Sequence, residues 1–425
     1  METTPQNIHG NFAAFIGLDW GDQEHVYQIF DIESQTTKEK KVRQNPIALA
    51  QWVAATKKIY PNQRIAIGLE QSKGAVINFL MEHDCFVIYV IAPKLAAKYR
   101  QAFKSSGAKD DGNDAGFILD ILMRHREKLC PWRQEDPKTR RLQILTEKRR
   151  NAVNERTRLS NRLKALLKQY FPLALDVSGD SLYSIIACSF LLKWTTYDSL
   201  KRTRINTIRN FYLKHGCRHI KTIEKRVKMI QQAKPLTTDK VVIETSVLET
   251  SMLVGQLMVL NQHIENYDDT IKKLFPNHKD AEIFSSLPGA GEILAPRLLA
   301  AFGSDRDRFK EAVDLQNYSG IAPVTVQSGK QCLVRWRWAC PKFLRQSFHE
   351  FAGESRKHSI WASAYYDKKR QQGKTHNAAV RSLAYKWVRI IFRCWKDRKS
   401  YDELTYIKAL KNHGSDLFQY MAQTE

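Results

Sequence analysis

Hydrophobic and polar residues follow two different periods along the first 125 residues of the chain. Short runs with strand character alternate with stretches in which apolar residues recur at helical spacing. The predicted strands are 12–19, 25–31, 38–43, 64–70 and 85–91, and the predicted helices are 46–58, 74–83, 93–103 and 114–126. Three strands are thus followed by helix, strand, helix, strand and helices. This order predicts a mixed α/β domain over residues 1–126.

The middle of the chain carries apolar residues at heptad spacing in two separate stretches. The first seam consists of Leu142, Leu145, Ala152, Leu159, Leu163, Leu166 and Tyr170, and the second of Leu253, Leu257, Leu260, Ile264, Tyr267, Ile271 and Leu274. Arg149 and Arg156 interrupt the first seam, and a smaller helical block, about 181–236, separates the two. Two such helices predict an antiparallel coiled-coil pair or a dimerising arm over 127–280. Ordinary amphipathic helices on a globular core would give the same pattern.

The pattern of residues changes again beyond Pro276. The run Leu287-Pro288-Gly289-Ala290-Gly291 is typical of a helix-hairpin-helix element, and a loop rich in Gly, Pro and Ser follows at 319–329. Helical patterns continue to the end, so we expect a mostly α-helical C-terminal domain over 281–425.

Positive charge is distributed unevenly along the chain. The net charge is +24, yet residues 1–120 contain 13 basic and 14 acidic residues, so the whole excess lies downstream. Residues 121–170 alone hold 15 basic and 5 acidic residues. Such an excess favours a polyanionic partner, and nucleic acid rather than a membrane.

The seven cysteines are scattered without a C-x-x-C pair, which indicates neither a zinc site nor a disulfide framework. The N-terminus has no signal-peptide pattern and the longest apolar runs are too short to span a bilayer. We therefore expect a cytoplasmic protein that does not enter membranes.

Four carboxylates stand at positions where their side chains could converge. Asp19 ends the first predicted strand and Glu70 ends the fourth, while Asp111 and Asp114 lie three residues apart at the start of a helix. A cluster of acids is tenable when hard cations neutralise it, and oxygen ligands suit Mg²⁺ or Mn²⁺. Two such ions can stabilise the attacking and leaving oxygens of a phosphodiester displacement. Any one of these acids alone is more often structural, for example by complementing a helix dipole.

The segments I-G-L-D, G-L-E-Q-S-K-G, V-I-Y-V-I-A-P and K-D-D-G-N-D-A resemble the DEDD transposases of the insertion-sequence "one-ten" family. The resemblance implies an RNase H-like (RuvC-like) N-terminal domain, whose order of strands and helices agrees with the predicted one. It also implies that Asp19, Glu70, Asp111 and Asp114 are catalytic acids and metal ligands for two Mg²⁺ ions, with Mn²⁺ as an alternative. Asp110 departs from the family pattern and competes with Asp111 as the third ligand.

A second block is similar to the same family: L-P-G-A-G-E-I-L-A, then L-Q-N-Y-S-G-I-A-P-V-T-V-Q-S-G-K, then F-L-R-Q-S-F-H-E-F-A. The resemblance implies that Ser328, in the S-G pair, is the nucleophile that forms a covalent phosphoserine link to DNA. From the residues alone, a serine beside glycine is usually a turn residue. Ser319 is the rival serine.

Several residues near Ser328 are candidates for nucleic-acid contacts. Lys330 follows it directly, and Arg335-Trp336-Arg337-Trp338 alternates cations with indoles, which can pair with phosphates and stack on bases. Tryptophans packed inward with solvated arginines explain the pattern equally well. Gly289 and Gly291 could present backbone N–H groups to a phosphate.

The resemblance further implies DNA as substrate, a structured guide ("bridge") RNA encoded by the element's flank, and a homodimer or homotetramer with a composite active site. It also implies a prokaryotic, nucleoid-associated location. The sequence thus predicts a Mg²⁺-dependent recombinase of an insertion sequence. A RuvC-like junction resolvase that uses water as nucleophile is the alternative, and a nucleic-acid-binding protein with a decayed site is a third reading.

Overall fold

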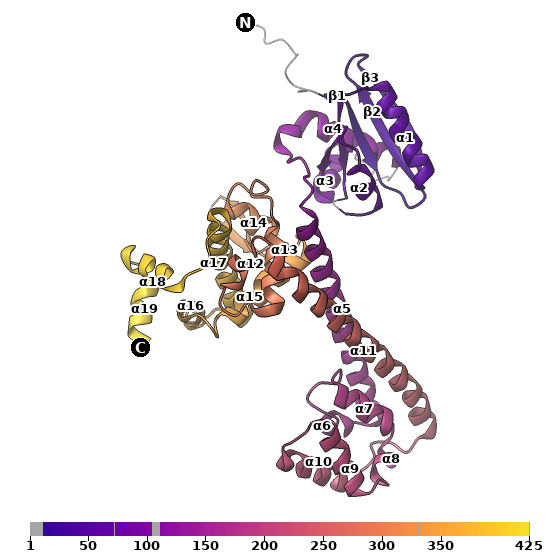
Figure 1. Ribbon diagram of the computed structural model, residues 1–425, viewed down its shortest axis with the longest axis vertical. Coiled ribbons are helices and arrows are strands. Elements are labelled where there is room, and N and C mark those ends of the chain that lie inside the picture. Colours follow the sequence, from indigo (N-terminus) through magenta and orange to yellow (C-terminus); the bar gives the residue numbers. More distant parts are fainter. Residues whose placement is uncertain (1–11, 72, 104–110, 330, 425) are drawn as a thin grey trace. The chain divides into compact units, whose positions relative to one another are not determined.

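The computed structural model describes residues 12–71, 73–103, 111–329 and 331–424, and the chain divides into two compact units, Met1–Gln134 and Glu135–Glu425 (Figure 1). The division falls after the predicted boundary at 126. The reason is that the chain returns to the sheet beyond that point. Trp132 N–H donates to the Ile88 carbonyl at 2.7 Å, and Pro131 forms a bridge with Tyr89.

The first unit is built on a mixed five-stranded sheet with the order β3-β2-β1-β4-β5. Its strands are β1 (Phe12–Asp19), β2 (Glu24–Asp31), β3 (Thr36–Arg43), β4 (Arg64–Leu69) and β5 (Phe86–Val90). The first three pair antiparallel, whereas β1, β4 and β5 run parallel. β1 lies at the centre and is buried on both faces, whereas only Val42 is buried in the edge strand β3. The predicted α/β domain at the N-terminus is confirmed.

Helices cover both faces of this sheet because successive side chains of a strand point to opposite sides. The helices are α1 (Pro46–Ile59), α2 (Ala75–Leu80), α3 (Pro93–Phe103) and α4 (Asp111–His125), followed by the short 3-10 helix η2 (Arg126–Lys128). On one face, Ile16 and Leu18 of β1 share a core with Trp52 of α1. On the other face, Phe15 of β1 packs with Leu119 of α4.

The second unit contains two long helices that pair antiparallel, α5 (Pro137–Tyr170) and α11 (Lys240–Leu274) (Figure 1). Most of the predicted seam residues are buried at the positions expected. The arginines that interrupt the seam form polar layers with the facing helix. Arg149 makes a bidentate pair with Asp268, at 2.6 and 3.0 Å, and Arg156 donates to Asn261 at 3.2 Å.

Among the described helices, α11 is long and apolar enough to cross a membrane by length and composition alone. A core helix of a soluble protein passes the same test, and Leu253, Leu257 and Ile271 of α11 belong to cores that also contain residues of α5. We assign it to the coiled-coil pair.

The helical block between α5 and α11 has five short helices: α6 (Ala174–Val177), α7 (Ile185–Lys193), α8 (Tyr197–Lys201), α9 (Ile205–Lys214) and α10 (Ile220–Gln232). Their apolar faces share one core with the C-terminal half of α5 and the N-terminal half of α11, in which Leu163, Phe190, Tyr212 and Leu253 are fully buried. The block is thus a small domain inserted at the end of the coiled-coil pair.

The rest of the second unit is mostly helical. Its elements are η3 (Phe275–Asn277), α12 (Ala281–Ser285), α13 (Gly291–Phe302), α14 (Ala312–Tyr318), β6 (Val324–Ser328), β7 (Gln331–Arg335), α15 (Lys342–Ser355), α16 (Ile360–Gln371), α17 (His376–Asp397), α18 (Glu403–Asn412) and α19 (Asp416–Thr424). Trp361, Trp387 and Trp395 are almost completely buried at its centre. Part of the predicted loop at 319–329 is a strand, because β6 pairs with β7 in a hairpin. Both strands are largely exposed and therefore carry no hydrophobic alternation.

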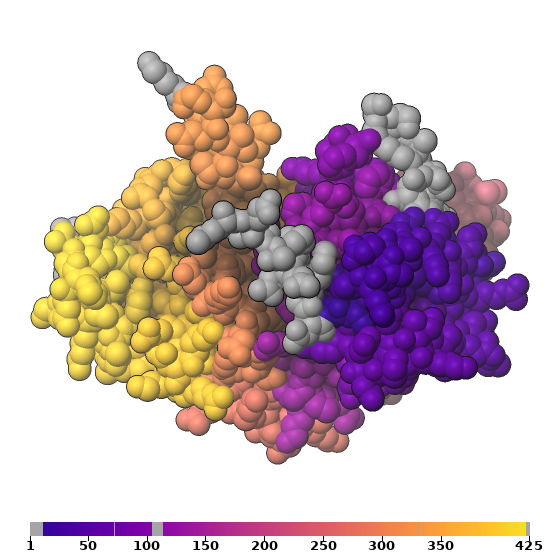
Figure 2. All heavy atoms as spheres, turned by 90° about the horizontal axis from the view of Figure 1, so that it is seen from above, coloured from indigo at the N-terminus to yellow at the C-terminus, as the bar shows by residue number. Residues whose placement is uncertain are grey.

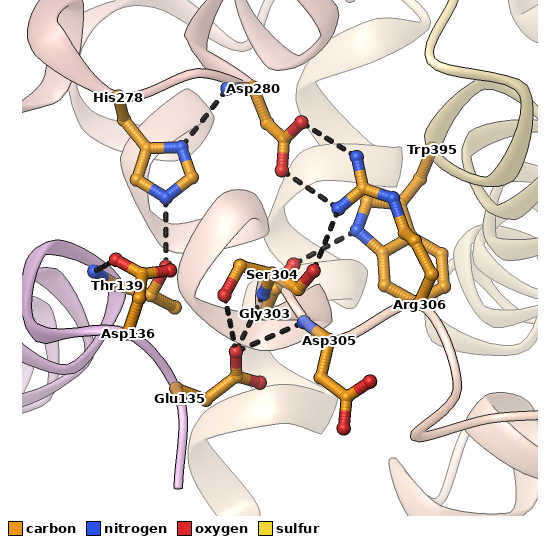
Figure 3. A network of polar contacts seen from close by, with 10 residues as sticks. All are labelled: Glu135, Asp136, Thr139, His278, Asp280, Gly303, Ser304, Asp305, Arg306 and Trp395. Atoms are coloured by element: carbon orange, nitrogen blue, oxygen red, sulfur yellow. Dashed lines mark hydrogen bonds and ion pairs between the residues drawn. The ribbon is translucent and has the colours of Figure 1, made fainter.

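A polar network joins the start of α5 to the C-terminal helices (Figure 3). Glu135 accepts hydrogen bonds from the backbone N–H groups of Ser304 and Asp305, at 2.8 and 3.1 Å. The imidazole of His278 accepts from the Asp280 N–H at 3.1 Å, and its other nitrogen lies 2.8 Å from the Thr139 hydroxyl. This network fixes where the long helix leaves the C-terminal helices.

Candidate active site

Asp19 and Glu70 lie side by side at the ends of the two central parallel strands. The register pairs Gly17 with Gly68 and Leu18 with Leu69, so the next residues along both strands are Asp19 and Glu70. Adjacent strands lie about 4.8 Å apart, and paired residues of parallel strands point to the same face. Both carboxylates are half-buried. The sequence prediction that these strand ends meet is therefore satisfied by the register.

Two glycines allow α4 to lie directly on this face of the sheet. A Cβ at Gly17 would stand 2.2 Å from the Ala115 carbonyl oxygen, and one at Gly68 would stand 3.1 Å from Ile118. The first contact leaves no room for a side chain. Because α4 packs Leu119 against Phe15 and Ala115 against Gly17, its N-terminal end lies toward Asp19. The glycines of I-G-L-D and I-G-L-E thus bring the helix that carries Asp114 to the acid pair.

Asp114 is a buried carboxylate, 8% exposed, and it has a cationic partner. Arg100 of α3 lies 3.2 Å from its Oδ2. A buried carboxylate is costly without a compensating charge, so this guanidinium neutralises Asp114. The sequence reasoning missed Arg100, because no spacing relates a residue in α3 to one in the following helix.

Asp111 begins α4 and lies three residues before Asp114, which places both on the first turn. The Asp111 side chain and the whole of Asp110 lie outside the described residues. Within the described ranges, no group of three metal-binding side chains is close enough to hold an ion. Carboxylate oxygens are the ligands that Mg²⁺ and Mn²⁺ prefer, so the side-chain types at these positions suit a divalent cation.

Ser328 is the last residue of β6 and lies at the tip of the β6–β7 hairpin in the second unit. Its side chain is exposed, and Gly329 beside it has a φ of +55°, where a Cβ would meet nothing within 4 Å. The space-filling view shows a projection in the hairpin's colour range (Figure 2). Within the described part of the chain, no hydrogen bond to the Ser328 hydroxyl is observed. An exposed tip can approach a bulky substrate such as DNA.

Ser319, the rival serine, is in a different environment. It is fully buried at the end of α14, and its hydroxyl donates to the Gln316 carbonyl at 3.3 Å. Substrate could reach it only if this packing opened.

The four arginines and tryptophans at 335–338 fall into two exposed and two half-buried residues. Arg335 is exposed, and Trp338 is 78% exposed. Trp336 is half-buried with Arg381 3.5 Å from its ring centroid. Arg337 donates to Asn317 Oδ1 at 2.9 Å and to the Ala322 carbonyl at 3.3 Å. Arg335 and Trp338 thus face solvent, while Trp336 and Arg337 also hold the base of the hairpin.

The helix-hairpin-helix glycines occupy the turn between α12 and α13, with φ values of +77° at Gly289 and +53° at Gly291. A Cβ at Gly289 would stand 2.7 Å from the His358 ring, whereas one at Gly291 would meet nothing within 4 Å. Packing against His358 therefore explains the glycine at 289. At Gly291, the first residue of α13, no neighbouring atom restricts a side chain. Lys330 lies outside the described residues.

Two family models match the chain, and together they cover more than half of it. A DEDD transposase model of the IS110 type, described as transposase, matches residues 16–172. A second model, described as transposase of the IS116/IS110/IS902 family, matches residues 281–367. The four acids fall within the first match, and Ser328 falls within the second.

Relatives align over almost the whole chain. A mini-circle protein for IS117 from Streptomyces coelicolor is 25% identical over 399 residues, which is 92% of this chain and 96% of the relative. Proteins of the insertion elements IS900 from Mycobacterium paratuberculosis and IS116 from Streptomyces clavuligerus are each 27% identical, over 92% and 91% of this chain and 97% and 95% of their own lengths. With matches in both units and relatives of full length, the chain belongs to the IS110 family of insertion-sequence transposases.

Proposed function

We propose that this transposase cleaves and rejoins DNA strands through a covalent phosphoserine intermediate, with Ser328 as nucleophile and Asp19, Glu70, Asp111 and Asp114 as the metal-binding acids. The observation that carries the proposal is the register that places Asp19 beside Glu70 under the start of α4. A set of oxygen ligands at this point suits divalent cations, and the basic second unit suits the polyanionic substrate.

In the proposed reaction, the Ser328 Oγ attacks a DNA phosphorus. The bond from phosphorus to one deoxyribose oxygen breaks, and that oxygen takes up a proton and leaves as a hydroxyl. The serine proton passes to solvent or to a nearby base. The phosphodiester becomes a serine phosphodiester, so the bond is exchanged and not hydrolysed, and attack by another strand's hydroxyl reverses the step. Bound Mg²⁺ would supply stabilisation of the negative charge that develops on the phosphoryl group.

The acids and the serine belong to different units of the chain. We propose that the active site is composite, with Ser328 of one protomer meeting the acids of another in a dimer or tetramer. We also propose that a structured guide RNA selects the DNA by base pairing. The location of the acids and the serine in different units supports the first proposal. The concentration of positive charge after residue 120, which provides for more nucleic acid than one scissile phosphate, supports the second.

The experiment is a denaturing-gel assay for a protein–DNA adduct. Purified protein is incubated with Mg²⁺, labelled DNA from the element's ends and RNA transcribed from its flank. We expect an adduct with the wild type that is lost in Ser328→Ala and in Asp19→Asn. Thr325→Ala is the matched control, because it removes an exposed hydroxyl from the same strand. It should form the adduct normally.

A RuvC-like resolvase that uses water is the competing function, because the same acids would serve it. Metal-dependent cleavage without an adduct, equal in the wild type and Ser328→Ala, would establish that alternative. An adduct that persists in Ser328→Ala would show that another residue is the nucleophile.

A further inference from the structure

The helical block between α5 and α11 contains a helix-turn-helix unit formed by α9 and α10 (Figure 1). α9 ends at Lys214, Gly216 follows with a φ of +80°, and the Cys217 N–H donates to the Tyr212 carbonyl at 3.0 Å. This pattern terminates a helix sharply and reverses the chain. Five residues, 215–219, separate α9 from α10, which begins at Ile220. A short glycine turn thus joins the two helices, as in units that place their second helix in DNA.

The two helices are held together independently of any ligand. Ile208 and Phe211 of α9 and Val227 of α10 are buried in the core of the block. Arg209 of α9 forms a bidentate pair with Glu224 of α10, at 2.7 and 2.8 Å. Lys201, just before the unit, donates to the last carbonyls of α10, at 3.3 Å from Ile230 O. The unit is therefore preorganised.

α10 has one apolar and one cationic face. Ile223, Val227 and Ile230 are buried, at helical spacing of four and three residues. Lys221, Lys225 and Lys228 repeat the same spacing two residues earlier, which at about 100° per residue puts them on the opposite side of the helix. All three lysines are exposed. The cationic stripe thus points away from the core along the length of α10.

The charge around this stripe is not neutralised. Glu224 is the one acidic residue of 205–232, and Arg209 already pairs with it. Lys214 and Arg218 extend the positive surface into the turn and are also exposed. Among the residues that the structure describes in this block, none forms an ion pair with these five cations. Their arrangement suits a polyanion with regularly spaced charges.

We infer that α9 and α10 form a binding surface for duplex DNA, with α10 in the major groove and Lys221, Lys225 and Lys228 on phosphates or guanine edges. A helix of 13 residues is about 20 Å long, and the B-form major groove, about 12 Å wide, admits it. Ile220, 69% exposed at the start of α10, is placed for apolar contact with a thymine methyl group. The major groove of an RNA duplex is too narrow and deep for a helix, which favours DNA as the partner.

This surface is separate from the proposed active site. Its residues lie at 205–232, outside both regions that match the transposase family models. Binding there requires neither Ser328 nor a metal ion. The inference goes beyond the proposed function and can fail or succeed independently of it.

The test measures binding by the full-length Ser328→Ala protein in EDTA, so that no chemistry contributes. Fluorescence anisotropy follows a labelled 24-bp DNA duplex of mixed sequence, and an RNA duplex of the same sequence, over a series of salt concentrations. The variant carries Lys221→Gln, Lys225→Gln and Lys228→Gln. The control carries the same charge change at three exposed lysines that lie far apart in the sequence, Lys58, Lys374 and Lys408.

For three lost phosphate contacts, the salt slope for DNA should become less steep by roughly 2–3, and affinity near 0.15 M salt should fall on the order of 100-fold. The scattered control should change little. Circular dichroism and the melting temperature should stay the same in both, because every replaced lysine is exposed. Equal DNA affinity and slope in the variant and the control would overturn the inference. A loss confined to the RNA duplex would overturn it too and identify an RNA surface.

Discussion

Glu350 of α15 bridges two arginines from two other helices, and its removal should destabilise the second unit. Its Oε2 lies 2.5 Å from Arg297 Nη1 of α13, and its Oε1 lies 2.9 Å from Arg150 Nη1 of α5. The Arg297 side chain is only 2% exposed, and its remaining described hydrogen bond goes to the Ser347 hydroxyl at 3.1 Å. Burial lowers the pKa of Arg150, and the charge of Glu350 opposes that effect.

The magnitude follows from this burial. Breaking a buried ion pair from one side costs about 3–5 kcal/mol, because the partner charge stays buried without compensation. Glu350 itself is one-third exposed, so we take the lower end, about 3 kcal/mol for Glu350→Gln. For a unit of this size that corresponds to a fall in melting temperature of roughly 6–10 °C. Adding Arg297→Met to Glu350→Gln should recover part of the lost free energy of unfolding, because it removes the buried guanidinium that has lost its partner.

The assay is urea denaturation followed by tryptophan fluorescence, which reports on the C-terminal core through Trp361, Trp387 and Trp395. Glu354→Gln is the matched control, since it makes the same change one turn further along α15. Glu354 pairs with Lys357 at the surface, and such a pair contributes about 0–1 kcal/mol. Equal free energies of unfolding in the two variants would refute the reasoning that the Glu350 bridge is a buried, stabilising charge.

Three further predictions concern other sites. Burial lowers the pKa of His278 below its usual 6.5, so its contribution to stability is complete above about pH 6.5 and is lost as the pH falls. The free energy of unfolding should therefore decline from about pH 7.5 to 5.5, and less so in His278→Gln; an equal decline would contradict this. Gly17→Ala should displace α4 from the sheet, lower the free energy of unfolding by about 1–3 kcal/mol and abolish adduct formation. Gly255→Ala is the control, because a Cβ there meets nothing within 4 Å, and it should have none of these effects. Arg100→Gln should increase Mn²⁺ affinity in calorimetry, because the guanidinium 3.2 Å from Asp114 competes with a cation; unchanged affinity would show that Asp114 is not a ligand.

The position of the acids illustrates what local pattern can predict. Asp19 and Glu70 each follow a run of buried strand residues, so their place at strand ends is readable from the sequence. That the two strands are neighbours, in a register that aligns these residues, requires the sheet itself. The glycines before them looked like ordinary strand residues, and only the packing of α4 explains why no side chain is tolerated at Gly17.

Polar residues in apolar patterns were harder to interpret. Arg149 and Arg156 weakened the prediction of a coiled coil, yet each donates to a partner more than 100 residues away in the sequence. The β6–β7 hairpin was not predicted, because both strands are exposed and therefore need no alternation of hydrophobic and polar residues. Its strands pair through backbone hydrogen bonds, which do not depend on the side chains.

The sequence by itself determined the elements that bury a periodic apolar face, the separation of a neutral domain from basic ones, and the family through its two motif blocks. These depend on local spacing and on composition, which a linear chain displays directly. The tertiary structure alone decided which distant charges meet, such as Arg100 with Asp114 and Glu350 with two arginines. It also decided that the lysine face of α10 points away from the core and forms no ion pair within the described residues of its block. These contacts depend on how helices pack across the core, and no local pattern encodes that geometry.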